Sequence, residues 1–299
     1  MKLRDAALLF VLAAIWGAAF LFVRVAVPVL GPFPLVASRL LLGGVLLFVY
    51  ASAIKQTPNW RAHWRRYVMI GIFNNAIPYV LISTAQLHLT ASFASLLNAT
   101  TPLFSAVIAA LWIQDRLTVP KLIGLGLGIV GVGVIVGWQQ QQVDAVWIVS
   151  VLLMFVSACS YGIAAVYSKI AFKGISPVST ATGQLLVAGG VVLPFAVLNP
   201  PQMDVQPLTI LAVVALATLS TAVAFQIYFH LIASAGPTSA ASVTLLVPFF
   251  SSLWAAIFLG EQLHANEIVG FFIILVGLLL VTGLWRYVVI LYRRTAPQP

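Results

Sequence analysis

The stretch PLFSAVIAALWIQDRLTVPKLIGLGLGIVGVGVIVG, residues 102–137, occurs in this chain a second time in altered form. Its counterpart, residues 248–283, reads PFFSSLWAAIFLGEQLHANEIVGFFIILVGLLLVTG. Both copies contain a proline, an apolar run, a short polar turn with an acidic residue, and a second apolar run rich in glycine. The pairs that match at a constant offset of 146 are Pro102 and Pro248, Phe104 and Phe250, Ser105 and Ser251, Asp115 and Glu261, Leu117 and Leu263, Gly124 and Gly270, Gly131 and Gly277, and Gly137 and Gly283.

This offset is close to half of the 299 residues, so the sequence predicts two copies of one structural unit. The match extends toward the start of the chain, because Trp16-Gly17 corresponds to Tyr161-Gly162 at an offset of 145. We expect the first unit over residues 1–140 and the second over residues 141–299.

The composition is that of a membrane protein. Apolar residues make up 62% of the chain, charged residues only 7%, and the mean hydropathy is +1.09. Soluble domains carry about 25% charged residues, so this chain has too few to cover a water-exposed surface. Its single cysteine, Cys159, excludes a disulfide framework and a cysteine metal site. The composition therefore predicts an all-α membrane protein whose surroundings are the lipid bilayer.

The apolar runs have the length of membrane-spanning helices. A helix needs about 20 apolar residues to cross about 30 Å of hydrocarbon at 1.5 Å per residue. Proline and glycine lie at or near most of the proposed ends. The ten predicted spans are residues 6–27, 33–54, 67–87, 92–113, 120–137, 146–168, 177–198, 208–232, 238–259 and 265–285.

The net charge of +9 is explained by orientation in the membrane better than by nucleic-acid binding. Basic residues gather in the loops on one side of the ten spans, and Asp144, Asp204, Glu261 and Glu267 lie on the other. The positive-inside rule predicts that the basic side and both termini are cytoplasmic. The basic residues on that side are Lys2, Arg4, Lys55, Arg61, Arg65, Arg66, Arg116, Lys121, Lys169, Lys173, Arg286, Arg293 and Arg294.

The two units are predicted to have opposite orientations in the membrane. Five spans per unit is an odd number, so the second unit enters the bilayer from the other side. The matched turns agree, because the turn at Asp115 is basic overall and the turn at Glu261 is acidic. Inverted repeats of this kind place a transported substrate near the membrane midplane between the two halves. We therefore expect a transporter that works by alternating access.

Polar residues near mid-depth are the candidates for binding a substrate, since polar groups in hydrocarbon are costly and usually face a wet cavity or the bundle interior. For any single serine or threonine the alternative is a hydroxyl bonded to its own helix carbonyl. Pro102 and Pro248 are predicted to kink their helices, either as gates or as static bends. The predicted substrate-binding residues are Trp16, Arg39, Asn75, Tyr79, Asn98, Tyr161, Thr244, Ser251 and Ser252.

Charged residues narrow the function further. Arg24 and Arg39 are the basic residues outside the cytoplasmic set, and either one binds a substrate carboxylate or extends to the interface. The acidic residues all lie in loops or at helix ends, which disfavours an antiporter that exchanges protons on a buried carboxylate. No catalytic set, metal cluster or cofactor site is predicted, because the glycine motif 126–131 lies inside an apolar span and suits helix packing.

The chain resembles the drug/metabolite transporter superfamily, and specifically its ten-helix EamA group of bacterial inner-membrane exporters. The resemblance implies export of amino acids or related metabolites through a central cavity. The second turn departs slightly, because glutamine stands where the group often has arginine. Trp16, Tyr79, Tyr161 and Trp254 would suit stacking on aromatic substrates, as in the aromatic amino acid exporters of the group. The matching elements are Trp16-Gly17-Ala18-Ala19-Phe20, Ala37-Ser38-Arg39-Leu40, Thr101-Pro102-Leu103-Phe104 with Asp115-Arg116-Leu117, and Val247-Pro248-Phe249-Phe250 with Gly260-Glu261-Gln262-Leu263.

Three functions remain to be compared. The favoured one is an inner-membrane exporter of amino acids or related small metabolites. The second is efflux of other small molecules such as cationic drugs, sugars or nucleosides, although the missing membrane carboxylate argues against cations. The third is a membrane scaffold, which the mid-depth polar residues disfavour. A monomer would already contain both halves of a pathway, and a dimer through glycine faces is compatible with the sequence.

Overall fold

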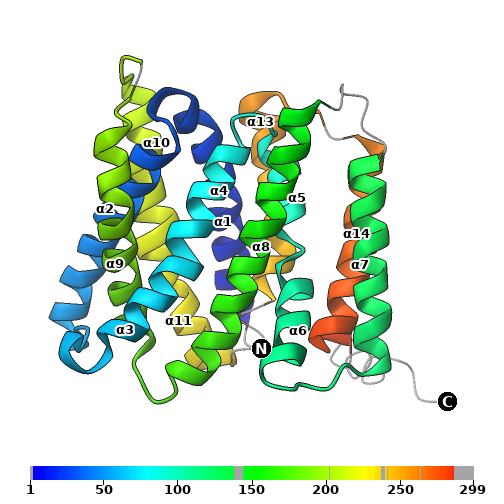
Figure 1. Ribbon diagram of the computed structural model, residues 1–299, viewed down its shortest axis with the longest axis horizontal. Helices are drawn as coiled ribbons and strands as arrows, with labels where there is room; N and C mark the ends of the chain where they lie inside the picture. Colours follow the sequence, from blue (N-terminus) through cyan, green and yellow to red (C-terminus); the bar gives the residue numbers. More distant parts are fainter. Residues whose placement is uncertain are drawn as a thin grey trace.

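A computed structural model describes residues 3–137, 144–201, 203–236, 240, 242–262 and 264–285. Within these ranges the chain forms helices and no strands (Figure 1). Nine helical stretches there are long and apolar enough to cross a membrane, and a tenth apolar helix, Val243–Leu259, is 17 residues long. The protein is therefore a multi-pass α-helical membrane protein, as the composition predicts.

The first repeat contains five spans, of which the third and fourth are interrupted. Its third span contains a π-helical segment, named η1, and its fourth is broken into two helices. Side chains cap two of the starts, because Asn59 accepts a hydrogen bond from Ala62 N and Thr90 accepts one from Phe93 N. The elements are α1 (Leu3–Leu30), α2 (Pro32–Ala53), α3 (Trp60–Gly71), η1 (Ile72–Ala76), α4 (Ile77–Ala85), α5 (Ala91–Asn98), α6 (Thr101–Trp112) and α7 (Val119–Gly137).

The second repeat has the same order of spans. Its third span again contains a π-helical segment, named η2, and Asp144 caps its first helix by accepting a hydrogen bond from Trp147 N at 2.7 Å. The elements are α8 (Ala145–Ala171), α9 (Pro177–Leu198), α10 (Pro207–Ala217), η2 (Thr218–Val223), α11 (Ala224–Ala235), α13 (Val243–Leu259) and α14 (Ala265–Thr282).

The π-helical segments occupy matching positions in the two repeats. The offset of 146 carries Ile72, the first residue of η1, onto Thr218, the first residue of η2. A π turn adds one residue to the helical turn, so it changes the direction of side chains that a regular helix would align. The polar residues of the third and eighth spans therefore do not all face the same neighbour.

The fourth and ninth spans match in sequence and differ in structure. The fourth is interrupted at Ala99 and Thr100, and Pro102 lies in the first turn of the helix that follows. Hydroxyl groups satisfy carbonyls at the break, because Thr101 Oγ1 donates to Asn98 O at 2.7 Å. The ninth span runs through Pro248 as one helix. The sequence predicts a kink at both prolines. The chain has a break just before Pro102 and a continuous helix through Pro248.

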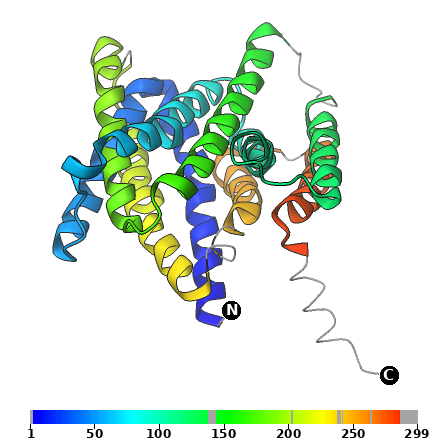
Figure 2. The same ribbon diagram turned by 60° about the horizontal axis from the view of Figure 1, so that its bottom comes forward.

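The fifth and tenth spans form a close helix pair at one edge of the molecule, where α7 and α14 lie side by side in both views (Figures 1 and 2). Glycines make this approach possible. A Cβ atom on Gly124 would lie 2.5 Å from Gly277 O, and one on Gly270 would lie 2.7 Å from Gly131 O. Within the glycine motif 126–131, Gly131 makes this close approach, whereas a Cβ on Gly126 would meet nothing within 4 Å. Helix packing therefore accounts for Gly131 and for the neighbouring Gly124.

The helix boundaries differ from the predicted spans mainly at polar ends. The third span begins at Trp60, seven residues before the predicted residue 67. Its first turns are amphipathic, with Arg61 and Arg65 beside Trp64, and hydropathy detects only the part of a helix that lies in hydrocarbon. The predicted start of the ninth span, residue 238, lies outside the described residues.

The two ends of the helical bundle differ in charge. We call the end that contains Lys55, Arg65, Arg66, Lys121 and Lys169 the basic end, and the other the acidic end. Helices from both repeats meet at the basic end, where Arg66 Nη1 of α3 donates to the carbonyl of Ala171, the last residue of α8, at 2.9 Å. The positive-inside rule predicts that the basic end is cytoplasmic.

Candidate functional site

A cavity of about 400 Å³ lies between the two repeats. This volume fits a small metabolite, since ligand sites measure about 300–1,000 Å³. Its walls come from seven of the ten spans. The lining residues are Trp16, Ala19, Phe20, Val23, Arg39, Asn74, Tyr79, Ile82, Ser83, Gln86, Ser95, Asn98, Ala99, Thr101, Pro102, Tyr161, Ala165, Phe225, Tyr228, Thr244, Val247 and Pro248.

Many of the lining residues form pairs that occupy matching positions in the two repeats. The same offset that defines the two units relates one lining residue to another, so the cavity lies on the axis that exchanges the repeats. The related pairs are Ala19 and Ala165, Tyr79 and Phe225, Ile82 and Tyr228, Asn98 and Thr244, Thr101 and Val247, Pro102 and Pro248, and, at an offset of 145, Trp16 and Tyr161.

Arg39 is the charged residue among the described lining residues, and the second repeat has no charged residue at the matching position. It is 9% exposed, and its match in the second repeat is the apolar Leu185. Arg39 Nε donates to Thr221 Oγ1 at 3.3 Å, and its Cζ lies 4.1 Å from the centre of the Tyr79 ring. Neither of the ion pairs among the described residues involves it. A buried guanidinium held by a hydroxyl and an aromatic face, without a carboxylate, keeps its charge available to an anionic ligand.

Aromatic side chains from several helices line the cavity. The rings of Trp16 and Tyr228 have centroids 5.4 Å apart and an interplanar angle of 49°. Tyr79, Tyr161 and Phe225 also line the cavity. Flat apolar faces of this kind contribute binding area to a ligand without fixing its charge.

Two amide oxygens supply acceptors on the same cavity. Gln86 Nε2 donates to Phe20 O at 3.1 Å, which fixes the orientation of the amide and leaves Gln86 Oε1 buried without a protein partner. Asn98 Oδ1 is also buried without a protein partner. Unsatisfied buried acceptors are costly, and a donor from a bound molecule would relieve that cost.

The cavity is closed toward the acidic end and open toward the basic end. Ser83, Gln86 and Ser95, which line it near the acidic end, are 2%, 0% and 1% exposed. Ala165 and Thr244, which line it nearer the basic end, are exposed. With the predicted orientation, this is an inward-open conformation.

Most of the predicted substrate-binding residues meet at this cavity. Trp16, Arg39, Tyr79, Asn98, Tyr161 and Thr244 line it, as do the predicted kink residues Pro102 and Pro248.

Three predicted residues do not line the cavity. Asn75 is fully buried in η1, where the π turn brings Asn74 to the cavity in its place. Ser251 Oγ donates to Ala91 O at 3.3 Å, and Ser252 is buried on the same helix. The close contact of Gly17 with the Ser251 backbone shows why, since α1 packs tightly on this face of α13.

Two other residues discussed from the sequence also have structural roles here. Trp254 Nε1 donates to Ala14 O at 3.0 Å, so this ring packs on α1 and does not line the cavity. Arg24 Nη1 donates to the carbonyls of Gln86 and Leu87, and it therefore caps the end of α4.

Several lining residues were not predicted, among them Phe225, Tyr228 and Gln86. The repeat offset would have found Phe225, because it matches the predicted Tyr79, but not Tyr228, whose match Ile82 was not predicted. Gln86 gives no such signal: its match, Ile232, does not line the cavity, and its position near a helix end indicates an interfacial residue.

An inverted repeat of five spans, a cavity on the repeat axis and an opening to one end define a membrane transport protein. Residues 4–137 and 148–283 each match the EamA-like transporter family. The chain belongs to this family.

Relatives extend along nearly the whole chain. The uncharacterized transporter YvbV of Bacillus subtilis is 27% identical over 285 residues, which cover 94% of this chain and 92% of the relative. The probable terminal-alkyne amino-acid exporter of Streptantibioticus cattleyicolor is 25% identical over 94% of both chains. A crystal structure superimposes with a TM-score of 0.66 at 18% identity, covering 96% of this chain and 99% of the other, which shows the fold alone. The protein is thus a multi-pass membrane transporter.

Proposed function

We propose that this transporter exports amino acids or closely related carboxylate-bearing metabolites by alternating access. The observation that carries the proposal is Arg39, a buried cation on the cavity with no carboxylate partner among the described residues. A guanidinium presents a planar fork of donors that matches a carboxylate. The substrate carboxylate would bind there beside the face of Tyr79.

The remaining lining supports a ligand that also carries donors. An ammonium group needs acceptors, and Gln86 Oε1 and Asn98 Oδ1 are buried acceptors without protein partners. Aromatic walls supply area for an apolar side chain. A relative named as a probable amino-acid exporter supports the same substrate class.

Efflux of cations has less support. No Asp or Glu lies among the residues that line the cavity in the described part of the chain, and Arg39 would repel a cationic ligand. The cavity therefore favours anions and zwitterions over cationic drugs.

Counterflow in proteoliposomes tests the proposal. Vesicles preloaded with unlabelled amino acids should accumulate labelled tryptophan, threonine or methionine. In Arg39→Gln we expect at least one of these rates to fall about 10- to 100-fold, because a charge-assisted hydrogen-bonded pair is lost. Arg39→Lys keeps the charge without the planar fork of donors, so its counterflow rate should fall less.

Arg61→Gln is the matched control, because Arg61 lies exposed at the basic end and does not line the cavity. Its counterflow should equal that of the unchanged protein. Folded protein that accumulates no amino acid, or an Arg39→Gln variant that transports at the original rate, would refute the proposal.

A further inference from the structure

The carboxylate of Glu261 binds the first turn of α5, a helix of the other repeat. Ala91 N donates to Glu261 Oε1 at 2.8 Å, and Ser92 N donates to Glu261 Oε2 at 3.0 Å. The Ser92 hydroxyl donates to Oε2 as well. One side chain of the turn between α13 and α14 therefore satisfies three donors at the start of the fourth span.

Two physical effects strengthen this contact between Glu261 and α5. A carboxylate accepting backbone N–H groups forms charge-assisted hydrogen bonds, which are stronger than neutral ones. The first turn of a helix also carries the positive end of the helix dipole and otherwise unpaired N–H groups. Two further contacts from the second repeat reach the same segment, since Ser251 Oγ donates to Ala91 O and the Phe93 ring lies 5.8 Å from that of Trp147.

The segment held by Glu261 forms part of the wall of the cavity at its closed, acidic end. Residues 91–97 of α5 are all buried, and Ser95 of this helix lines the cavity. The helix ends at Asn98, and the break at Ala99 and Thr100 separates it from α6. A helix with a break at one end and a latch at the other is able to move as a unit.

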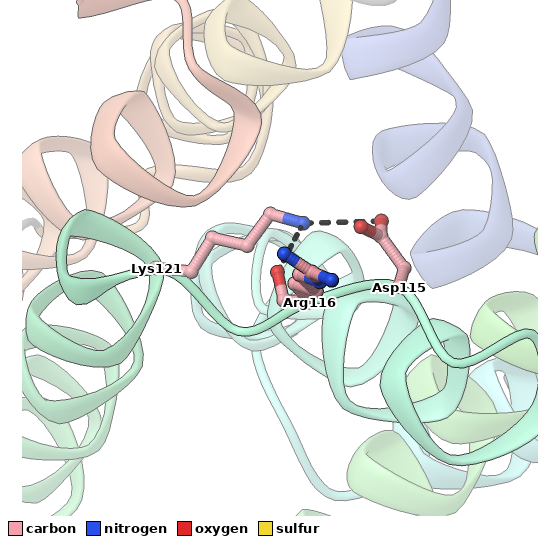
Figure 3. Close-up of polar contacts among 3 residues, drawn as sticks. All are labelled: Asp115, Arg116 and Lys121. Atoms are coloured by element: carbon pink, nitrogen blue, oxygen red, sulfur yellow. Dashed lines mark hydrogen bonds and ion pairs between the residues drawn. The ribbon is translucent and has the colours of Figure 1, made fainter.

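The matched acidic residue of the first repeat makes a different contact. Asp115 forms an ion pair with Lys121 at 3.0 Å within its own turn, where Lys121 Nζ also donates to Arg116 O (Figure 3). The Asp115 side chain is 44% exposed. The carboxylate that bridges the two repeats is thus found at the closed end of the cavity, and the one that stays within its own turn is found at the open end.

We propose that Glu261 is the latch of the gate at the acidic end of the cavity, and that α5 is the gate, hinged at Ala99 and Thr100. While the carboxylate holds Ala91 and Ser92, the cavity opens only toward the basic end. Its release allows α5 to move away and opens the cavity to the other side. This latch rests on the alternating access proposed above, whichever substrate is carried.

Thiol labelling tests the latch without any substrate. In a Cys159→Ser background, Ser83→Cys places a single reporter on the cavity wall near the acidic end, on a helix that the latch does not touch. A membrane-impermeant methanethiosulfonate reagent is added to right-side-out vesicles, so that it reaches the reporter only through the gate. We expect Glu261→Gln to speed labelling about tenfold, since an amide of the same shape loses the charge and one acceptor.

Asp115→Asn is the matched control and should leave the labelling rate from that side unchanged. Ser92→Ala removes only the hydroxyl donor and should speed labelling about two- to threefold, which is a test that remains if Glu261→Gln does not fold. Equal labelling rates in the folded Glu261→Gln and unchanged proteins, or in Ser92→Ala where only that variant folds, would overturn the latch.

The two proposals fail in different ways. If the substrate were not an amino acid, counterflow would be absent and Glu261→Gln would still accelerate labelling. If Glu261 were only a structural cap, counterflow would depend on Arg39 and the labelling rate would not respond to Glu261.

Discussion

The pair α7 and α14 keeps the symmetry of the two repeats, whereas the fourth and ninth spans break it. In the glycine pair, Gly124 faces Gly277 and Gly131 faces Gly270, so each contact has a symmetric copy. In the other pair, the fourth span is broken before Pro102 and the ninth is one helix through Pro248.

This difference separates a scaffold from a moving part. An inverted repeat that alternates between two conformations exchanges the structures of matched elements, so elements that already match need not change. The glycine pair is such an element. The fourth and ninth spans, with the turns that follow them, differ within one conformation, and they are therefore the elements we expect to exchange.

The largest expected effect is a loss of stability when the close contact between α7 and α14 is disturbed. In Gly124→Ala the new Cβ would lie 2.5 Å from Gly277 O, and backbone atoms have to move apart to admit it. We expect the free energy of unfolding to fall by about 2–3 kcal/mol. The measurement is the thermal unfolding midpoint in detergent.

Gly126→Ala is the control on the same helix, because a Cβ there meets nothing within 4 Å. Alanine is the better helix former, so this variant should be unchanged or more stable by about 0.5–1 kcal/mol. Equal losses in both variants would mean that close approach of α7 and α14 does not hold the scaffold together.

A smaller effect should distinguish the two matched prolines. Pro102 lies in the first turn of α6, where its missing N–H costs little, so Pro102→Ala should change stability by less than about 0.5 kcal/mol. Pro248 lies inside α13, where it removes a helix hydrogen bond, so Pro248→Ala should add about 1 kcal/mol. Chemical unfolding of both variants measures the difference, and equal shifts would show that the break and the continuous helix are equivalent.

The fold was predictable because the two signals that define it are long. Apolar spans of about 20 residues and a repeat over half of the chain leave little freedom in the number or order of helices. The break at Ala99 and the π segments were not predictable, since a sequence shows where proline removes a hydrogen bond but not how the helix adapts. The two matched prolines, with different outcomes, illustrate this limit.

Site residues were predictable where depth in the membrane alone decides whether a residue lines the cavity. Arg39 and Tyr79 are polar or aromatic residues within spans, and both line the cavity. Asn75 was predicted for the same reason, but the π turn brings Asn74 to the cavity instead, which depth does not reveal. The contact of Glu261 with Ser92 joins residues 169 positions apart, and only the packing of the two repeats brings them together.

The smallest effect tests whether the two turns are alike in backbone while their acidic residues differ in contact. Gln114 and Gly260 match in the repeat, and both have left-handed backbone angles, with φ of 54° and 65°. The following N–H groups also match, since Asp115 N donates to Ala109 O and Glu261 N donates to Ala255 O, each at 3.2 Å.

A left-handed conformation costs a residue with a side chain about 1 kcal/mol and costs glycine almost nothing. Gln114→Gly should therefore stabilise the protein by up to about 1 kcal/mol, and Gly260→Ala should destabilise it by about as much, in thermal unfolding. Opposite signs at matched positions would mean that both repeats use the same turn backbone. A loss of stability in both variants would mean that the Gln114 side chain is needed where it lies.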